Sequence, residues 1–200
     1  NFSGNIRYSK SNYSVEGSYS VYNAQMGIAR ATHIGNTTDL YNAINNSEPN
    51  YISGFSYAIN SPKQEVTHHT AKLSYFQNVG LNNKFELHYA FQNNNRKEFD
   101  IRRSSTDKRA ALDLGLLSQN LGIHYKTFLK EWTFLNGLNF GFQNNTANPN
   151  TGVRPLIPNF TKQDIGAFSI FKYTVNNSLV LEAGARYDFS KIEADKFYLK

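Results

Sequence analysis

Apolar and polar residues alternate with a period of two along most of this chain, which is typical of strands with two different faces. The clearest stretch is KFELHYAFQNNNRKEFDIRR, residues 84–103. Its apolar parity holds Phe85, Leu87, Tyr89 and Phe91, and its polar parity holds Glu86, His88, Gln92 and Asn94. Beyond Phe91, polar and charged residues enter both parities. One face of this strand is therefore expected to meet an apolar environment and the other to meet water.

The same alternation predicts eight strands, at about 3–10, 13–30, 64–79, 84–103, 110–128, 131–143, 163–175 and 179–192. Helical periodicity is nearly absent. The exception is TTDLYNAI, residues 37–44, which predicts a helical turn with Thr37 or Thr38 as N-cap and Asp39 in the first turn. Pro49 is expected to end any helix that begins there.

Short and long connections take turns along the chain. The short ones lie at about 9–12, 80–83, 130–131 and 175–178, and the longer ones at about 31–63, 104–109 and 144–162. This rhythm predicts an all-β, antiparallel up-and-down meander with short turns at one end and long loops at the other. Several predicted strands exceed the roughly 9–11 residues that a membrane crossing needs. The layout is typical of outer-membrane β-barrels, with short periplasmic turns and long extracellular loops.

Composition limits the class of protein. The chain has 200 residues, including 13 Tyr, 15 Phe and no Cys, which excludes disulfide frameworks and thiolate metal sites. The net charge of +6 comes from scattered cations, whereas a nucleic-acid-binding protein would usually concentrate them, so no nucleic-acid partner is expected. The chain begins with Asn1 and shows no signal-peptide pattern, so we expect an internal segment of a longer protein.

Several stretches resemble one protein family. They are HIGNTTDLYNAI from His33, PKQEVTHHTAKLSY from Pro62, YAFQNNNRKEFDIRR from Tyr89, RPLIPNF from Arg154 and LEAGARYDF from Leu181. In their order and spacing they resemble the barrel of TonB-dependent outer-membrane receptors of the Bacteroidetes type, across nearly the whole chain.

The resemblance implies that residues 1–200 are one part of a barrel domain of about 22 strands, without its plug domain and its remaining strands. It also implies a multi-pass protein of the Gram-negative outer membrane that takes up a ferric siderophore or similar metal chelate. Its partners would be membrane lipid, the plug of the same protein, the chelate, and the TonB–ExbB–ExbD complex. Transport of this kind involves no enzymatic step and no cofactor.

Two other arrangements fit the alternation. A closed eight-stranded outer-membrane barrel would serve as a structural, adhesive or pore protein. A soluble β-sandwich or solenoid that binds glycans would also have one buried face along each strand.

In a membrane barrel the charged parity should face water, because Arg or Lys facing lipid at the midplane costs roughly 2–4 kcal/mol. The residues predicted to line the lumen are Glu86, His88, Gln92, Asn94, Glu182, Arg186 and Asp188. The residues predicted to face lipid are Phe85, Leu87, Tyr89, Phe91, Trp132, Phe134, Leu138, Phe140, Leu179 and Leu181.

Charged residues near the loops are candidates for substrate binding at the barrel mouth. They are His33, Asp39, Arg96, Glu98, Asp100, Arg102 and Arg154. The four from Arg96 to Arg102 share one parity of the strand, and a ladder of compensating charges on the wall is the alternative interpretation of them.

No metal site is predicted. His68 and His69 are adjacent, so on a strand they point to opposite faces and cannot share an ion; an i, i+2 spacing would be needed. Either could join His33, His88 or His124 only through folding that the sequence does not show. Motifs of nucleophilic, zinc-dependent or nucleotide-binding enzymes are also missing from the sequence, which gives no support to an enzyme.

Overall fold

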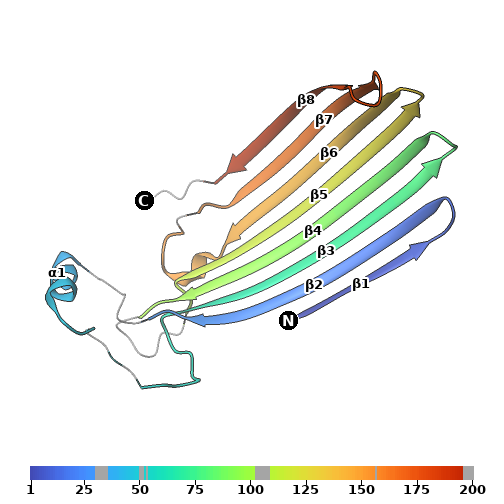
Figure 1. Ribbon diagram of the computed structural model, residues 1–200. Helices are drawn as coiled ribbons and strands as arrows, with labels where there is room; N and C mark the ends of the chain where they lie inside the picture. Colours follow the sequence, from blue (N-terminus) through green and yellow to red (C-terminus); the bar gives the residue numbers. More distant parts are fainter. Residues whose placement is uncertain (30–35, 50–51, 53, 102–108, 156, 196–200) are drawn as a thin grey trace.

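The computed structural model describes residues 1–29, 36–49, 52, 54–101, 109–155 and 157–195, which form a single eight-stranded sheet (Figure 1). The strand order is β1-β2-β3-β4-β5-β6-β7-β8, and every neighbouring pair is antiparallel. The strands are β1 (Phe2–Ser9), β2 (Tyr13–Gly27), β3 (Lys63–Val79), β4 (Asn83–Phe99), β5 (Leu112–Leu129), β6 (Trp132–Ala147), β7 (Phe160–Thr174) and β8 (Val180–Ala194). The prediction of an all-β antiparallel meander is confirmed.

The four hairpin turns gather at one end of the sheet and the three longer connections at the other, as the sequence predicted (Figure 1). Local chemistry closes each turn. Lys130 between β5 and β6 has a φ of 49°, and Gly80 between β3 and β4 has a φ of 67°. Between β7 and β8, the Asn176 side chain accepts hydrogen bonds from the backbone N–H groups of Ser178 and Leu179, both at 2.9 Å. Leu179 therefore closes the turn and lies outside β8, whereas we had predicted it as a strand residue.

Several strands begin or end elsewhere than predicted at the loop end of the sheet; β2, for example, ends at Gly27 rather than at about residue 30. β4 ends at Phe99 rather than at residue 103, because Asp100 Oδ1 accepts the backbone N–H of Ile101 at 2.7 Å, a local bond that competes with the ladder. β6 instead continues to Ala147, and β7 begins at Phe160, so Asn145 pairs with Phe160. This stretch has polar residues on both faces, so the hydrophobic pattern does not predict a strand there, although the backbone pairing continues.

The segment between β2 and β3 contains a helix, α1 (Thr37–Asn45), and a 3-10 helix, η2 (Pro149–Thr151), follows β6. The N-cap of α1 is Asn36, whose side chain accepts the N–H of Asp39 at 2.9 Å, so the prediction of Thr37 or Thr38 as cap was wrong by a residue or two. Asp39 does lie in the first turn. Neither helix is long and apolar enough to cross a membrane.

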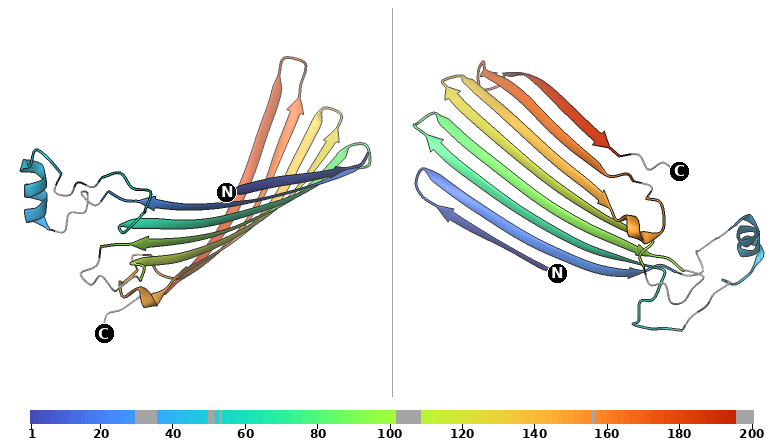
Figure 2. Two further views of the ribbon diagram at one scale, coloured as in Figure 1. Left: turned by 90° about the horizontal axis from the view of Figure 1, so that it is seen from below. Right: turned by 180° about the vertical axis from the view of Figure 1, so that it is seen from behind.

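The register defines two faces of the sheet. The apolar face carries Phe85, Leu87, Tyr89 and Phe91 of β4 and the residues in line with them on the other strands. The polar face carries Glu86, His88, Gln92 and Asn94 and their neighbours in register. Ala147 is the one buried hydrophobic residue among those described, so the sheet has no core of its own. Figure 2 shows a single twisted layer with no second layer over either face.

Glycines on the polar face leave room for side chains that lie across neighbouring strands. A Cβ at Gly137 would overlap the ring of Phe168 and would lie 2.9 Å from Cδ2 of His124. At Gly166, an added Cβ would overlap the carboxylate of Asp188. Side chains on the polar face therefore pack over the glycines of neighbouring strands, within a single layer.

We expect Gly137→Ala to lower the free energy of unfolding by about 1–3 kcal/mol, because the methyl group displaces Phe168 and His124. The single tryptophan, Trp132, reports unfolding by its fluorescence during a urea titration in detergent or lipid. The control is Gly54→Ala, where an added Cβ meets nothing within 4 Å. A change below about 0.5 kcal/mol, the usual range for open surface sites, would contradict this account of Gly137.

Candidate functional site

The apolar face carries a continuous band of hydrophobic side chains from strand to strand. One row joins Tyr75, Leu87, Ile123, Leu138, Ala167 and Tyr187 through successive strand pairs. The next row joins Leu73, Tyr89, Leu121, Phe140, Ile165 and Phe189. Large members remain exposed, among them Leu138 at 44%, Ile165 at 47% and Phe189 at 54%. An exposed apolar surface of this extent marks a contact with lipid or with another protein surface.

Aromatic rings border this band at the turn end of the sheet. The ring of Trp132 lies 4.4 Å from that of Tyr173 between centroids, and Phe134 meets Phe171 edge to face at 5.5 Å. On the first strands, Tyr8, Tyr13, Tyr75 and Phe85 form a chain of rings with centroid separations of 6.2, 6.2 and 6.3 Å. Aromatic borders of this kind occur where membrane strands cross the lipid–water interface.

At the loop end, the apolar face becomes polar and charged. Its charged residues within the described strands are Lys63, Glu65, Lys97, Asp113, Lys191 and Glu193. All six lie beyond the apolar band. Lys191 Nζ lies 2.6 Å from Glu193, and this hydrogen bond holds the pKa of the Glu193 carboxyl below its usual value. This side of the sheet is therefore apolar near the turns and charged near the loops, while the backbone pairing stays regular.

The polar face carries charges along its whole length, and many of them are paired two residues apart on one strand. Arg186 binds Asp188 through two hydrogen bonds of 2.6 Å, and Lys162 Nζ lies 3.0 Å from Asp164. Arg96 and Glu98 form a further ion pair, which agrees with the charge-ladder interpretation of this stretch. The side chains are partly exposed, so each pair contributes little to stability and mainly balances charge.

A hollow of about 440 Å³ lies over the middle of the polar face. Lys72, His88, His124, Asp164, Arg186 and Asp188 are among the residues that line it. Cations, carboxylates, imidazoles and amides alternate around it. Tyr89, Leu121, Phe140 and Ile165 also line the hollow, so its wall is partly polar and partly apolar.

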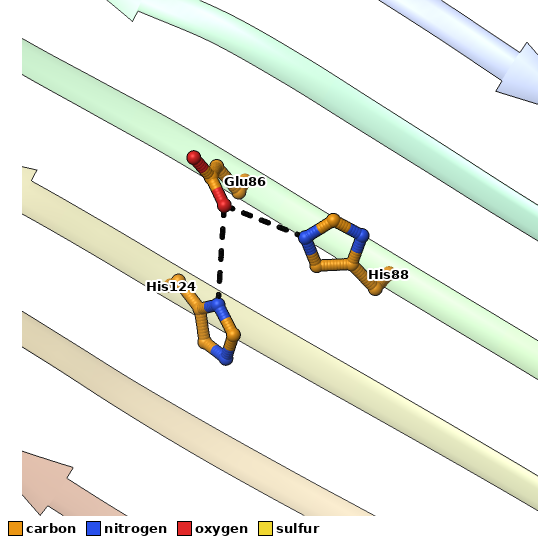
Figure 3. Close-up of side chains that lie close together, drawn as sticks. All are labelled: Glu86, His88 and His124. Carbon is orange, nitrogen blue, oxygen red and sulfur yellow. Dashed lines mark hydrogen bonds and ion pairs between the residues drawn. The ribbon is translucent and has the colours of Figure 1, made fainter.

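Glu86, His88 and His124 lie close together on β4 and β5 (Figure 3). His88 and His124 also line the hollow. Glu86 pairs with His124 in the β4–β5 register, and His88 lies two residues along β4 on the same face. Oε2 of Glu86 is 3.4 Å from Nε2 of His88 and 4.0 Å from Nδ1 of His124. Of the described residues, these are the three whose donor atoms are close enough to share a metal ion.

The sequence predicted no metal site, and we considered His88 and His124 only as partners of His68 or His69. His68 and His69 do point to opposite faces, as predicted: His68 bonds to Thr70 and Asn94, whereas His69 bonds to the hydroxyl of Tyr19. The spacing that such a site requires was present at Glu86 and His88. The contribution of His124 depends on the register of β4 with β5, which the sequence pattern does not reveal.

The predicted face assignments agree with the register. The seven residues expected in the lumen lie on the polar face, and those expected to face lipid lie on the apolar face, except Leu179 in the turn. Whether these faces meet lumen and lipid stays a prediction. Of the candidate mouth residues, Arg96 and Glu98 are brought together on β4, Asp39 lies in exposed α1 and Arg154 in the exposed segment after η2. His33 and Arg102 lie outside the described residues, and Asp100 follows β4.

Well-buried residues lie at the connection from β6 to β7, among them Thr151 of η2, which is 4% exposed. Asn145 is 5% exposed, and its Nδ2 donates to the carbonyl oxygen of Pro158 at 2.9 Å. In return, Oδ1 of Asn159 accepts the backbone N–H of Ala147 at 2.7 Å. The two bonds fasten Pro158 and Asn159, at the end of the RPLIPNF stretch, to the end of β6.

Comparison of this chain with family models, with curated proteins and with solved structures finds no match. The resemblance to TonB-dependent receptors therefore stays a prediction from the sequence.

We expect Asn145→Ala to loosen the connection between β6 and β7, because it removes a buried hydrogen bond worth about 1–3 kcal/mol. Limited proteolysis should then cut within residues 148–159 several-fold faster than in the unmodified protein. Asn95→Ala, at an exposed position on β4, serves as the control and should leave the cutting rate unchanged. Equal rates in both variants would show that the bond does not hold the loop.

Proposed function

We propose that this chain forms part of the wall of a transmembrane β-barrel in a Gram-negative outer membrane. The barrel would belong to a TonB-dependent receptor that takes up a ferric siderophore or a similar metal chelate. The apolar face would meet lipid and the polar face would line the lumen. The long connections would lie outside the cell, where they contact the substrate, and the short turns would face the periplasm.

The distribution of charge between the two faces carries the proposal. In the described strands, Asp, Glu, Lys and Arg are absent from the apolar band, whereas the opposite face at the same height carries Lys72, Glu86, Asp164, Arg186 and Asp188. Lipid imposes this rule, because Arg or Lys at the midplane costs roughly 2–4 kcal/mol on the lipid side and little on the lumen side.

The height of the band supports the same conclusion. On β6 it runs from Trp132 to Phe142, roughly 33 Å of strand at ~3.3 Å per residue. A strand tilt of about 45° reduces this to roughly 23 Å, close to the ~25 Å apolar band of outer-membrane barrels. β3, β4 and β5, with 17, 17 and 18 residues, extend beyond that band and would carry the loops away from the membrane surface.

The architecture favours a large barrel over the two alternatives. A soluble sandwich buries its apolar face under a second sheet, and the described residues supply no such layer. A closed eight-stranded barrel requires pairing between its first and last strands. In the described residues β1 and β8 occupy opposite edges of the sheet, which suits a wall continued by other strands.

The receptor function rests on the sequence resemblance and on the loop end of the sheet. The connection from β2 to β3 exposes Phe55 and Tyr57 at 86% and 91%, with their rings edge to face at 4.9 Å. Exposed rings of this kind suit contact with a chelate that carries aromatic or apolar groups. The plug and the TonB complex would act through other parts of the receptor.

The face assignment is tested with single cysteines, because the chain has none of its own. Leu121 and Asn120 are adjacent on β5 and lie on opposite faces, so they form a matched pair. We expect a fluorophore on Leu121→Cys to be quenched by nitroxide lipids, and one on Asn120→Cys by iodide in water. If iodide quenches both labels equally in membranes, the apolar face does not meet lipid and the proposal fails.

The transport function is tested in cells that lack this protein. With a panel of radioactive ferric chelates, accumulation of at least one should fall to the level of a strain that lacks TonB, and the restored gene should recover it. Unchanged accumulation of every metal chelate would overturn the receptor proposal, while the labelling experiment would still decide whether the chain is a membrane wall.

A further inference from the structure

We propose that Glu86, His88 and His124 bind one divalent transition-metal ion on the polar face, with Zn²⁺ as the best match. Two imidazole nitrogens and one carboxylate oxygen form a ligand set that zinc commonly uses, and imidazole disfavours Mg²⁺ and Ca²⁺. This inference depends only on the β4–β5 pair and stands whether or not the sheet belongs to a transport barrel.

The geometry is close to that of a bound ion. Every pair among the three donor atoms lies within 4.8 Å, and Oε2 of Glu86 lies 3.4 Å from Nε2 of His88 and 4.0 Å from Nδ1 of His124. Ligands at about 2.1 Å around a tetrahedral ion are roughly 3.4 Å apart. Small side-chain rotations would complete the site, because all three residues stand on paired strands and no backbone shift is needed.

Neighbouring residues orient the two imidazoles. Oγ of Ser74 on β3 lies 3.1 Å from Nδ1 of His88, and an Nδ1–H that donates to it leaves the Nε2 lone pair directed at the cluster. The ring of His124 packs edge to face on Phe168 at 5.5 Å, in the space that Gly137 leaves open. Partners of this kind fix a ligand's ring and its tautomer before the metal arrives.

The site has room for a fourth ligand. The side chains of Glu86, His88 and His124 are 35%, 38% and 28% exposed, and His88 and His124 line the open hollow. Three protein ligands with one open position are typical of zinc sites that exchange a water molecule or a substrate atom. The ion would therefore be accessible to solutes on the polar face.

The test is metal binding by the full chain, untagged and metal-free in detergent, measured by calorimetry with Zn²⁺ and separately with Ca²⁺. We expect one Zn²⁺ per chain and no Ca²⁺ binding. Glu86→Gln and His124→Ala should each weaken Zn²⁺ binding by at least about tenfold, since each removes a ligand, and Ser74→Ala should weaken it by about tenfold through His88. The matched control is His68→Ala, which removes an imidazole from the same face outside the cluster and should leave the affinity unchanged.

The ligand count is measured independently of the variants by electron paramagnetic resonance of bound Cu²⁺. The unmodified chain should show coupling to two imidazole nitrogens, so the proposal stays decidable even if a variant does not fold. His124→Ala should reduce the coupling to one nitrogen. Absence of Zn²⁺ binding, equal loss in His68→Ala, or coupling to fewer than two imidazoles in the unmodified chain would overturn the proposal.

Discussion

Backbone pairing between neighbouring strands is the interaction on which the whole structure depends. Seven antiparallel pairs run without interruption from β1 to β8, and their described residues enclose no hydrophobic core beyond Ala147. In an ordinary soluble domain, burial of apolar side chains supplies most of the stability. Here the ladders define the sheet, and the described residues leave many apolar side chains of one face exposed. The strands are accordingly long, since length adds backbone pairs without requiring a second layer.

The register also decides which side chains become neighbours. Because each strand is paired in register with the next, residues far apart in sequence form rows across each face. Leu87 and Tyr187 stand in one apolar row, and Glu86 and Arg186 stand on the same polar face. A slip of one residue in any pair would move that strand's charges onto the apolar face. The contrast between the faces and the gathering of Glu86, His88 and His124 therefore have a common cause.

Much of the fold could be predicted from alternation, because a strand with one apolar face has an apolar residue at every second position. The predicted strand ends were wrong where this alternation stops. Past Phe91 and Phe142 both faces are polar, so the pattern placed the end of β4 too late and the end of β6 too early. At these positions, local hydrogen bonds such as those of Asp100 and Asn145 decide where the strand ends. The N-cap of α1 was also predicted wrongly, because the side chains of Asn36, Thr37 and Thr38 can all accept a hydrogen bond from a backbone N–H.

The class of fold, the eight strands, the alternation of short and long connections and the composition of each face could all be predicted from the amino-acid sequence alone. These features are local, because they depend on the identity of neighbouring residues and on turn chemistry. Which residues of different strands meet is known only from the three-dimensional structure. The i, i+2 spacing of Glu86 and His88 is visible in the sequence, but the contribution of His124 requires the β4–β5 register. Pairing across strands is a long-range property of the backbone, and alternation with a period of two looks the same in every register shifted by two residues.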